Sequence, residues 1–267
     1  MCLELVGLSK AFNNGKQGGA TPVLAAVNLR IERGQFVSIV GPSGCGKSTL
    51  LRIISGLESS FEGDVILEGR RITGTSQEIG LVFQQYALFP WRTMLENIEM
   101  GLEIMGVSKE ERRALAREYI RAFGMSGAED RYPSQLSGGM QQRVAIARTL
   151  IMKPRIILMD EPFGSLDSQT RNDMQEFLLQ VWQERNETIV FVTHNVDEAV
   201  FLSDRIVVLS RRPASILKHF EINFARPRDR TAREVNEVRH EVINILREQR
   251  REQDTWITRP HVEAAGS

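Results

Sequence analysis

The segment GPSGCGKST at Gly41–Thr49 carries the strongest chemical signal in this sequence. It fits the pattern G-x-x-x-x-G-K-[S/T], and it lies between an apolar stretch and a segment of helical period. Glycines let the backbone curl closely around phosphate groups, so that its N–H groups and the positive end of a helix face the phosphate oxygens. A chance match to four fixed letters is expected in roughly one chain in a hundred of this length. The segment therefore predicts a phosphate-binding loop.

The phosphate loop also carries side chains suited to a nucleotide triphosphate and Mg²⁺. Lys47 is expected to hold the β and γ phosphates, and the Ser48 hydroxyl is expected to bind Mg²⁺. Cys45 lies at the positive end of the predicted helix, so we expect thiolate formation to be favoured and bound nucleotide to block its alkylation. The predicted nucleotide-binding residues of the loop are Gly41, Pro42, Ser43, Gly44, Cys45, Gly46, Lys47, Ser48 and Thr49.

A pair of acids follows the apolar run in RIILMDEP. The four residues Ile156–Met159 predict a buried strand that delivers Asp160 and Glu161 to its carboxyl end. Asp160 would anchor Mg²⁺ indirectly, and Glu161 would polarise a water molecule for attack on the γ-phosphate. Taken alone, the same letters fit a solvated turn after a strand equally well. Together with the phosphate loop, they predict a nucleotide hydrolase.

Two further segments have both a chemical and a structural interpretation. In LSGGMQQR, a Ser-Gly-Gly turn opens an amphipathic helix whose free N–H groups could bind an anion, but Ser137 could equally be a plain helix cap. In VTHNVDEA, His194 follows an apolar strand, where a histidine often has no chemical role. Spacing alone leaves these alternatives open.

Taken together, the phosphate loop, the acid pair, LSGGMQQR and the histidine in VTHNVDEA resemble the ATP-binding cassette family over roughly residues 3–215. The resemblance implies an α/β fold of the P-loop NTPase (RecA-like) type, with a mixed sheet core, an N-terminal antiparallel β layer and an inserted helical subdomain. It implies a nucleotide-binding domain over residues 1–225, with the helical subdomain inserted at about 90–150. Residues 226–267 would form a C-terminal helical tail.

The family resemblance also implies roles for individual residues. In such proteins Ser137, Gly138 and Gly139, followed here by Gln141, clamp the ATP of the opposite subunit. Two copies would therefore form a head-to-tail dimer, and Asp167 in GSLD would lie in the loop that crosses their interface.

Three more residues complete the implied site. Gln84 in LVFQQYALFPW corresponds to the glutamine that touches Mg²⁺ and the attacking water, with Gln85 as the less favoured neighbour. His194 corresponds to the switch histidine that reaches the γ-phosphate. Phe12 stands where an aromatic ring stacks on adenine, although it could also be a core residue.

The charge, cysteine content and apolar segments of the chain exclude several classes of function. Lys plus Arg and Asp plus Glu are each 34, so nucleic acid is not an expected partner. The two cysteines form no disulfide framework. No segment approaches the ~20 apolar residues of a membrane span, and the N-terminus does not resemble a signal peptide. We therefore expect a peripheral protein at the cytoplasmic face of the inner membrane.

The order of apolar runs predicts the elements that position these residues. The first 40 residues read as strands around the loop NNGKQGGATP, and a helix is expected from about Lys47 to Ser55. FEGDVILEG and EIGLVFQ are expected to form a strand pair. Three amphipathic helices are also expected. The first has Ser108 and Glu111 at capping-box spacing and an apolar face of Leu115, Tyr119, Ala122 and Phe123. The apolar face of the second is Met174, Phe177, Leu178, Val181 and Trp182, and that of the third is Val235, Val238, Val242, Ile245 and Leu246. The third helix is expected to pack back on the core.

The segments around these motifs resemble the nitrate, sulfonate and taurine importer branch of the family. That branch implies a separate integral membrane permease, docked near Phe89, Pro90 and Trp91, and an extracytoplasmic solute-binding protein as an indirect partner. The stretch YALFPW also resembles sugar and polyamine importers, so another cargo stays an alternative.

A soluble cassette ATPase of repair or translation is a further alternative, but those proteins generally carry coiled-coil insertions or a second cassette. A nucleotide-binding module without turnover is disfavoured, since Glu161 and His194 are both present.

Overall fold

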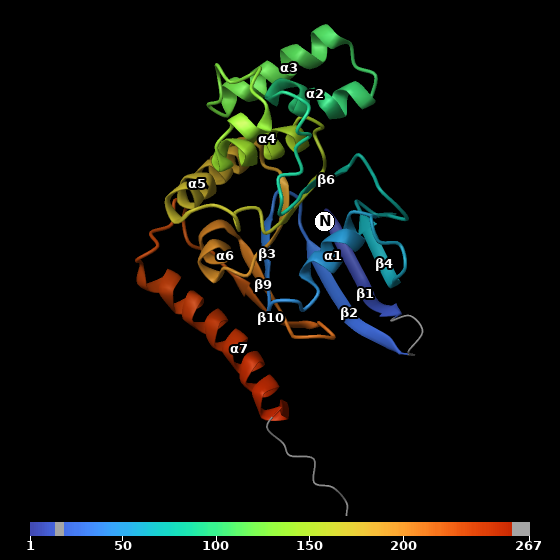
Figure 1. The fold of residues 1–267 in the computed structure, drawn as a ribbon. Coiled ribbons are helices and arrows are strands. Elements are labelled where there is room, and N and C mark those ends of the chain that lie inside the picture. Colours follow the sequence, from blue (N-terminus) through green and yellow to red (C-terminus); the bar gives the residue numbers. More distant parts are fainter. Residues whose placement is uncertain (14–18, 258–267) are drawn as a thin grey trace, which may run out of the picture.

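The computed structural model describes residues 1–13 and 19–257 of the chain, with side chains up to residue 249. Two sheets lie at the centre of the molecule (Figure 1). The first is antiparallel, in the order β2-β1-β4-β5, and consists of β1 (Leu3–Asn13), β2 (Ala20–Ile31), β4 (Glu62–Leu67) and β5 (Arg70–Arg71). The second, in the order β10-β9-β3-β8-β7-β6, consists of β3 (Phe36–Val40), β6 (Ile79–Val82), β7 (Ile156–Asp160), β8 (Thr188–Val192), β9 (Arg205–Leu209) and β10 (Ile216–Glu221).

The mixed α/β fold with an N-terminal antiparallel layer is confirmed, but one predicted strand pairing was wrong. β4 pairs with β1 and β5 in the antiparallel sheet, whereas β6 pairs with β7 in the larger sheet. Strands that follow each other in sequence usually pair, which is why the pairing was expected. Here the hairpin to β5 occupies one edge of β4 and β1 occupies the other, so β6 must find its partner elsewhere.

The larger sheet is parallel from β9 to β6, and only β10 runs antiparallel to its neighbour. Its central strands are buried on both faces, as a parallel sheet covered by helices requires. The strands β3, β8, β7 and β6 are consecutive neighbours. Because the strands are parallel, the segments that follow them meet at one edge of the sheet.

Helix α1 (Lys47–Ile54) lies between the two sheets and starts directly after β3 and its loop. Its apolar side chains belong to the core cluster that contains residues of both sheets. Gly46 precedes the helix with φ 124°, a conformation that side chains rarely adopt. A Cβ atom at this position would lie 2.9 Å from the Val23 side chain of β2. The close approach of the loop to β2 therefore requires glycine.

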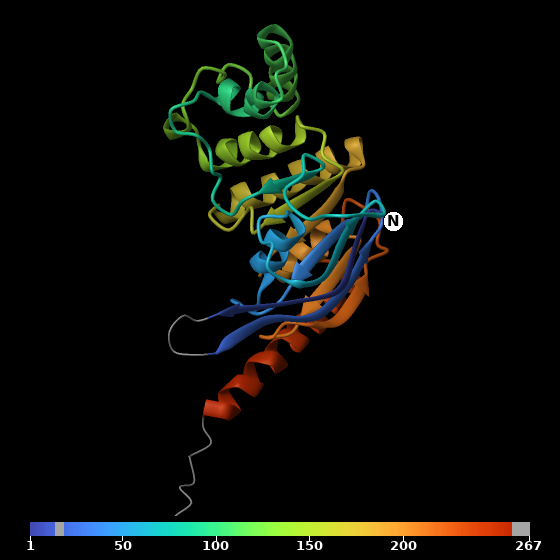
Figure 2. The ribbon, with the colours of Figure 1, turned by 90° about the vertical axis from the view of Figure 1, so that its right-hand side faces the viewer.

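Three helices, α2 (Met94–Ile104), α3 (Lys109–Ala122) and α4 (Gly138–Leu150), gather at one end of the molecule (Figures 1 and 2). Thr93 and Glu96 form a reciprocal capping box at the start of α2. Ser108 caps α3 by accepting from the Glu111 N–H group at 3.3 Å. Ala122 is exposed, because the buried face of α3 turns toward Ala116 and Ile120 instead. The boundaries of the inserted subdomain stay a prediction.

Three further helices cover the larger sheet or extend from it: α5 (Ser168–Arg185), α6 (Val196–Leu202) and α7 (Arg233–Ile257). Val235 and Val242 of α7 are buried against a cluster that contains α6 residues. The C-terminal helix thus packs on its own chain, at the end opposite the helical group (Figure 2). Residues 14–18 of the predicted loop and 258–267 of the predicted tail lie outside the described residues.

Candidate functional site

The phosphate loop closes on itself through its lysine. Lys47 is only 5% exposed, and its Nζ donates to the carbonyl oxygens of Gly41, at 2.9 Å, and of Pro42, at 3.0 Å. These bonds connect the first turn of α1 to the beginning of the loop, which holds the intervening backbone in a tight curve. A cavity of about 400 Å³ adjoins this curve and is lined by Ser43, Gly44, Gly46, Lys47, Ser48, Thr49, Glu161, His194 and Arg212.

Ser48 and Asp160 join the phosphate loop to β7. The Ser48 hydroxyl donates to Oδ1 of Asp160 at 3.0 Å. Burial raises the pKa of the Asp160 carboxyl above its usual value, and the hydrogen bond from Ser48 opposes this effect. Two oxygen ligands therefore stand side by side next to the loop.

This pair of oxygens suits Mg²⁺. No group of three or more His, Cys, Asp or Glu side chains able to hold a metal occurs among the described residues. An ion at Ser48 and Asp160 would therefore need its other ligands from phosphate and water. Mg²⁺ is typically bound in this manner, by one or two protein oxygens and the phosphates of its nucleotide.

Glu161 and His194 form the second pair at the sheet edge. His194 Nδ1 lies 2.8 Å from Glu161 Oε2, and the histidine side chain is 58% exposed toward the cavity side. The Glu161 backbone has φ 44°, and its N–H donates to the Val192 carbonyl oxygen at 2.9 Å. That bond fixes the acid to the end of β8, directly beside His194.

The glutamine and the aromatic residue lie outside this cavity. Gln84 and Gln85 follow β6 and are exposed. Nε2 of Gln84 lies 3.9 Å from the position of a Cβ atom on Gly164, within the loop that follows Glu161. Phe12 is on β1 and 40% exposed, with Nζ of Lys10 located 4.5 Å from its ring centre. The exposure of Phe12 rules out the core interpretation.

The Ser-Gly-Gly turn also lies outside the phosphate cavity of its own chain. Ser137 caps α4, and its hydroxyl accepts from the Met140 N–H group at 3.3 Å. Gly138 and Gly139 form the first turn of that helix. The Gln141 side chain donates to the carbonyl oxygens of the preceding turn, so its amide N–H groups are engaged within the chain. The turn opens α4, which belongs to the group of helices at one end of the molecule (Figure 1).

Asp167 caps α5 and is exposed. Its carboxylate accepts from the N–H groups of Gln169, at 3.1 Å, and Thr170, at 3.0 Å. The hydrogen bond from Thr170 is the main cause of a pKa below the usual value for Asp167. The Asp167 carboxylate is therefore charged at neutral pH.

Arg212 is the residue at the cavity that sequence reasoning missed. It is exposed on the turn between β9 and β10. The turn is fixed beside β2, because Ala214 donates to the Val23 carbonyl at 2.8 Å and accepts from Ala25 at 2.9 Å. In the sequence, LSRRPAS reads as a polar turn, and no spacing connects it to the phosphate loop.

Known proteins are similar in sequence to this chain over most of its length. Residues 24–164 match the protein family described as ABC transporter. An ABC transporter ATP-binding protein of Methanocaldococcus jannaschii is 51% identical over 92% of this chain and 92% of its own length. The aliphatic sulfonates import ATP-binding protein of Bacillus cereus is 44% identical, over 91% and 95%. The nitrate import ATP-binding protein of Synechocystis is 47% identical, over 84% and 83%.

Solved structures share the fold. The ATP-binding cassette MJ0796, described as a dimer in a post-hydrolysis state bound to ADP and Pi, superimposes with a TM-score of 0.71. It is 35% identical to this chain and covers 84% of this chain and 100% of its own. A second dimeric structure of the same protein has a TM-score of 0.72 and 36% identity, with the same coverage.

The expectation of a favoured thiolate at Cys45 was wrong. The side chain is 2% exposed, and its sulfur packs against the Cα side of Gly41. Burial raises the pKa of the Cys45 thiol, and the charges of Lys47 and Arg212 oppose this effect without overcoming it. The position at a helix start suggested activation, but desolvation has the larger effect here.

Cys45 should therefore label slowly with maleimide even without nucleotide. In a Cys2→Ala variant, which keeps Cys45 as the single thiol, we expect native labelling at pH 7.5 to be at least about tenfold slower than in denaturant. The rate should keep rising with pH beyond the usual thiol value of 9.0, because the folded-state pKa is higher. Rapid native labelling that ATP blocks would contradict the buried placement.

Arg212 should strengthen nucleotide binding, because it adds a second cation to the cavity that holds Lys47. We expect Arg212→Ala to raise the Kd for a fluorescent ATP analogue about tenfold, equivalent to about 1.4 kcal/mol. Arg211→Ala is the matched control, since Arg211 is on the same turn but does not line the cavity, and it should change the Kd less than about twofold. Equal effects of the two changes would refute a specific role.

Proposed function

Because this chain belongs to the ABC transporter family, we propose that it is the ATP-hydrolysing subunit of an importer and acts on a separate membrane permease. One observation carries the proposal. Adjacent parallel strands bring the phosphate loop, Glu161 and His194 to a single cavity, and Asp160 is bonded to the loop through Ser48. Each pairing there is suited to hydrolysis: Ser48 with Asp160, and Glu161 with His194.

Within this proposal, each residue has a defined part in hydrolysis. Lys47 and the loop N–H groups hold the phosphates and balance their charge. Glu161 accepts a proton from the attacking water, whose oxygen bonds to the γ-phosphorus as the bond to the leaving ADP oxygen breaks. His194 orients the Glu161 carboxylate through their 2.8 Å contact. Gln84 stands beside the loop after Glu161, where its amide can help to position the water.

Mg²⁺ would be held by the Ser48 hydroxyl and, through water, by Asp160. When bound, it neutralises charge on the phosphate oxygens. The 3.0 Å hydrogen bond between Ser48 and Asp160 holds both oxygens beside the phosphate loop for that task.

The proposal includes a dimer of two copies, arranged head to tail. Its support is that Ser137, Gly138 and Gly139 form a helix start suited to phosphate but do not line the cavity of their own chain. A second copy would bring this turn over the phosphate loop, with Asp167 at the crossing. The solved relatives are described as dimers. Phe12 would stack on the adenine through the exposed face of its ring.

A groove beside β6 is the proposed docking site of the permease. It has a volume of about 400 Å³ and is lined mainly by apolar side chains, among them Phe83, Phe89 and Met100. Trp91 is 70% exposed and contacts the lining residue Phe89 edge to face, with ring centres 5.4 Å apart. Arg148, in the groove wall, donates to the carbonyl oxygens of residues 86 and 87. Movement of a docked helix would thus reach the segment that carries Gln84.

The proposed cargo is a small anion such as a sulfonate, taurine or nitrate, since two relatives are named for sulfonates and nitrate import. An extracytoplasmic solute-binding protein would deliver it to the permease. This chain would bind at the cytoplasmic face of the inner membrane. Across residues 1–13 and 19–257, no helix combines the length and apolar character needed to span a bilayer.

The Glu161→Gln variant tests the hydrolytic role. We expect ATP turnover to fall at least about 100-fold, because the carboxylate that takes the proton is lost. ATP-dependent dimerisation should persist, since the ligands of the phosphates remain. Phosphate release and size-exclusion chromatography measure the two properties. Glu176→Gln, the same change at an exposed site on α5, should leave both unchanged; full activity in Glu161→Gln would exclude this acid as the base.

Affinity purification from gently solubilised native membranes tests the transporter role. The Glu161→Gln protein should recover a multi-span membrane protein. Adding Trp91→Ala should reduce that recovery strongly, because loss of a central interface tryptophan commonly costs about 2 kcal/mol or more. Leu57→Ala, at another exposed apolar side chain, is the control. Recovery of soluble proteins or nucleic acid alone would overturn the transport proposal but leave the ATPase site intact.

A further inference from the structure

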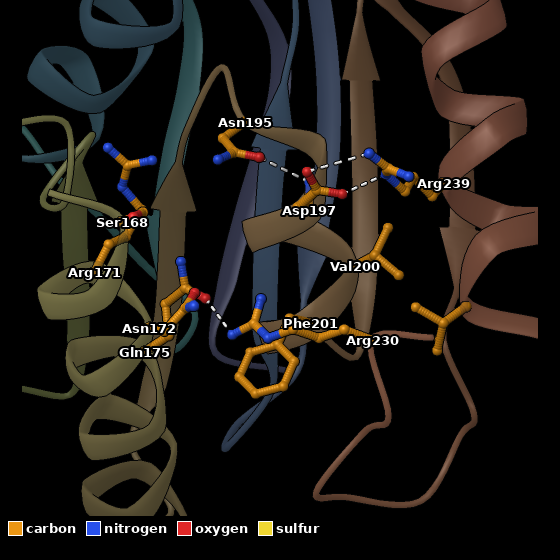
Figure 3. Close-up of a pocket in the computed structure, with 11 residues that line it drawn as sticks. Ser168, Arg171, Asn172, Gln175, Asn195, Asp197, Val200, Phe201, Arg230 and Arg239 are labelled. Carbon is orange, nitrogen blue, oxygen red and sulfur yellow. Dashed lines mark hydrogen bonds and ion pairs between the residues drawn. The ribbon is translucent and has the colours of Figure 1, made fainter. Parts of the chain in front are cut away.

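A second cavity, separate from the phosphate site, lies where α5 and α6 meet the C-terminal segment, which contributes Arg230, Val235 and Arg239 (Figure 3). It has a volume of about 260 Å³ and shares no lining residue with the phosphate cavity. Its lining includes Ser168 and Asn195, which directly follow Asp167 and His194 in sequence. The cavity therefore adjoins both loops that the proposed mechanism uses.

Hydrogen-bond donors outnumber acceptors in this cavity. Arg230 uses one nitrogen to donate to Gln175 at 2.6 Å, and its guanidinium stacks 3.6 Å from the centre of the Phe201 ring. Asn195 accepts from the Asp197 N–H group through its side-chain oxygen, which leaves its NH₂ group as a donor. The Asn172 amide has no hydrogen-bond partner within the described part of the chain. Figure 3 shows these side chains around a common space.

Two of the acceptors that line the cavity are already engaged. The Asp197 carboxylate pairs with Arg239, and the Gln175 oxygen with Arg230. Three lining residues are arginines and one is an aspartate, so the lining itself has a net charge of +2. Arg171 is partly balanced by the buried Glu198, at 3.7 Å. Burial lowers the pKa of Arg230, and the charges of Glu176, Asp197 and Glu198 oppose this effect without overcoming it.

We propose that this cavity binds a small oxoanion, such as phosphate or an organic sulfonate, between Arg230, Asn172 and Asn195. The three groups offer donors from three different elements to one acceptor-rich ligand. The volume is below the roughly 300–1,000 Å³ of sites for drug-sized ligands, so it favours a compact anion over a nucleotide.

The bound anion also affects ATP hydrolysis, through Arg171. This effect on hydrolysis rests on the proposed function. Arg171 donates to the carbonyl oxygens of Phe163, at 3.3 Å, and Leu166, at 2.7 Å, both between the acid pair and Asp167. It also faces Glu198, which accepts from Thr193, the residue before His194, at 2.6 Å. An anion in this cavity fastens these loops to the C-terminal segment and slows their movement, so it lowers turnover.

The binding test uses the Glu161→Gln protein with saturating Mg-ATP, so that the phosphate loop is filled. Phosphate and 2-hydroxyethanesulfonate are titrated separately at constant ionic strength, with chloride as the reference, and calorimetry reports the Kd. Asn172→Asp places a negative charge in the exposed wall of the cavity and should raise the Kd at least tenfold. Gln180→Glu, the same change in charge at an exposed site farther along α5, should alter it less than twofold.

Binding of phosphate alone would identify the hydrolysis product as ligand, and binding of the sulfonate would identify an organic solute. If neither binds below 20 mM, or if both variants lose affinity equally, the site is refuted. The chain without the Glu161 change then tests regulation. The anion should slow ATP hydrolysis there and in Gln180→Glu, but not in Asn172→Asp. Binding without slowing would overturn the regulatory part alone, and a wild-type chain without ATPase activity would instead refute the proposed function.

Discussion

Parallel pairing in register is the constraint on which the candidate site depends. Asp160 pairs with Val192 across β7 and β8, and Ile39 of β3 pairs with the same residue from the other side. This register sets Asp160 beside Ser48, and it sets the Glu161 N–H against the Val192 carbonyl. Because successive side chains point to opposite faces, a slip of one residue in β7 would move Asp160 away from the loop and separate Glu161 from His194. Apolar packing on both faces of the strands prevents that slip.

The same packing buries the positive charge of Lys47, which no ion pair within the described residues neutralises. The Lys47 Nζ donates only to neutral carbonyl oxygens. Burying a cation without an ion-pair partner costs free energy, and the charge of Asp160 offsets part of this cost, so the folded loop favours binding of an anion. Arg212 adds to this field from a separate strand turn. Ligand binding and folding stability are thus linked at the loop, because a ligand that binds only the folded chain stabilises it.

Local chemistry explains why much of the site could be predicted from sequence. A phosphate loop needs its glycines and Lys47 at fixed spacing, and an acid after a buried strand must emerge at the strand end. Cys45, Arg212 and the partner of β6 could not be predicted, because each depends on segments far apart in the chain. The helix start at Cys45 suggested a reactive thiol, but the surrounding core determines its pKa. Arg212 reaches the cavity only because its turn is bonded to β2.

The position of the Ser-Gly-Gly turn bears on how ATP could drive movement. A ligand shifts a conformational equilibrium only if it binds one state better than the other. ATP held by the phosphate loop alone would bind an open and a closed dimer about equally, since the loop is complete within one chain. The N–H groups at Ser137–Gly139 lie outside that cavity, so their contact with ATP would exist only in the closed dimer. The phosphate loop and the Ser137–Gly139 turn lie apart within one chain, and this separation would let ATP favour the closed dimer. Loss of the γ-phosphate would then remove the contact that holds the dimer closed.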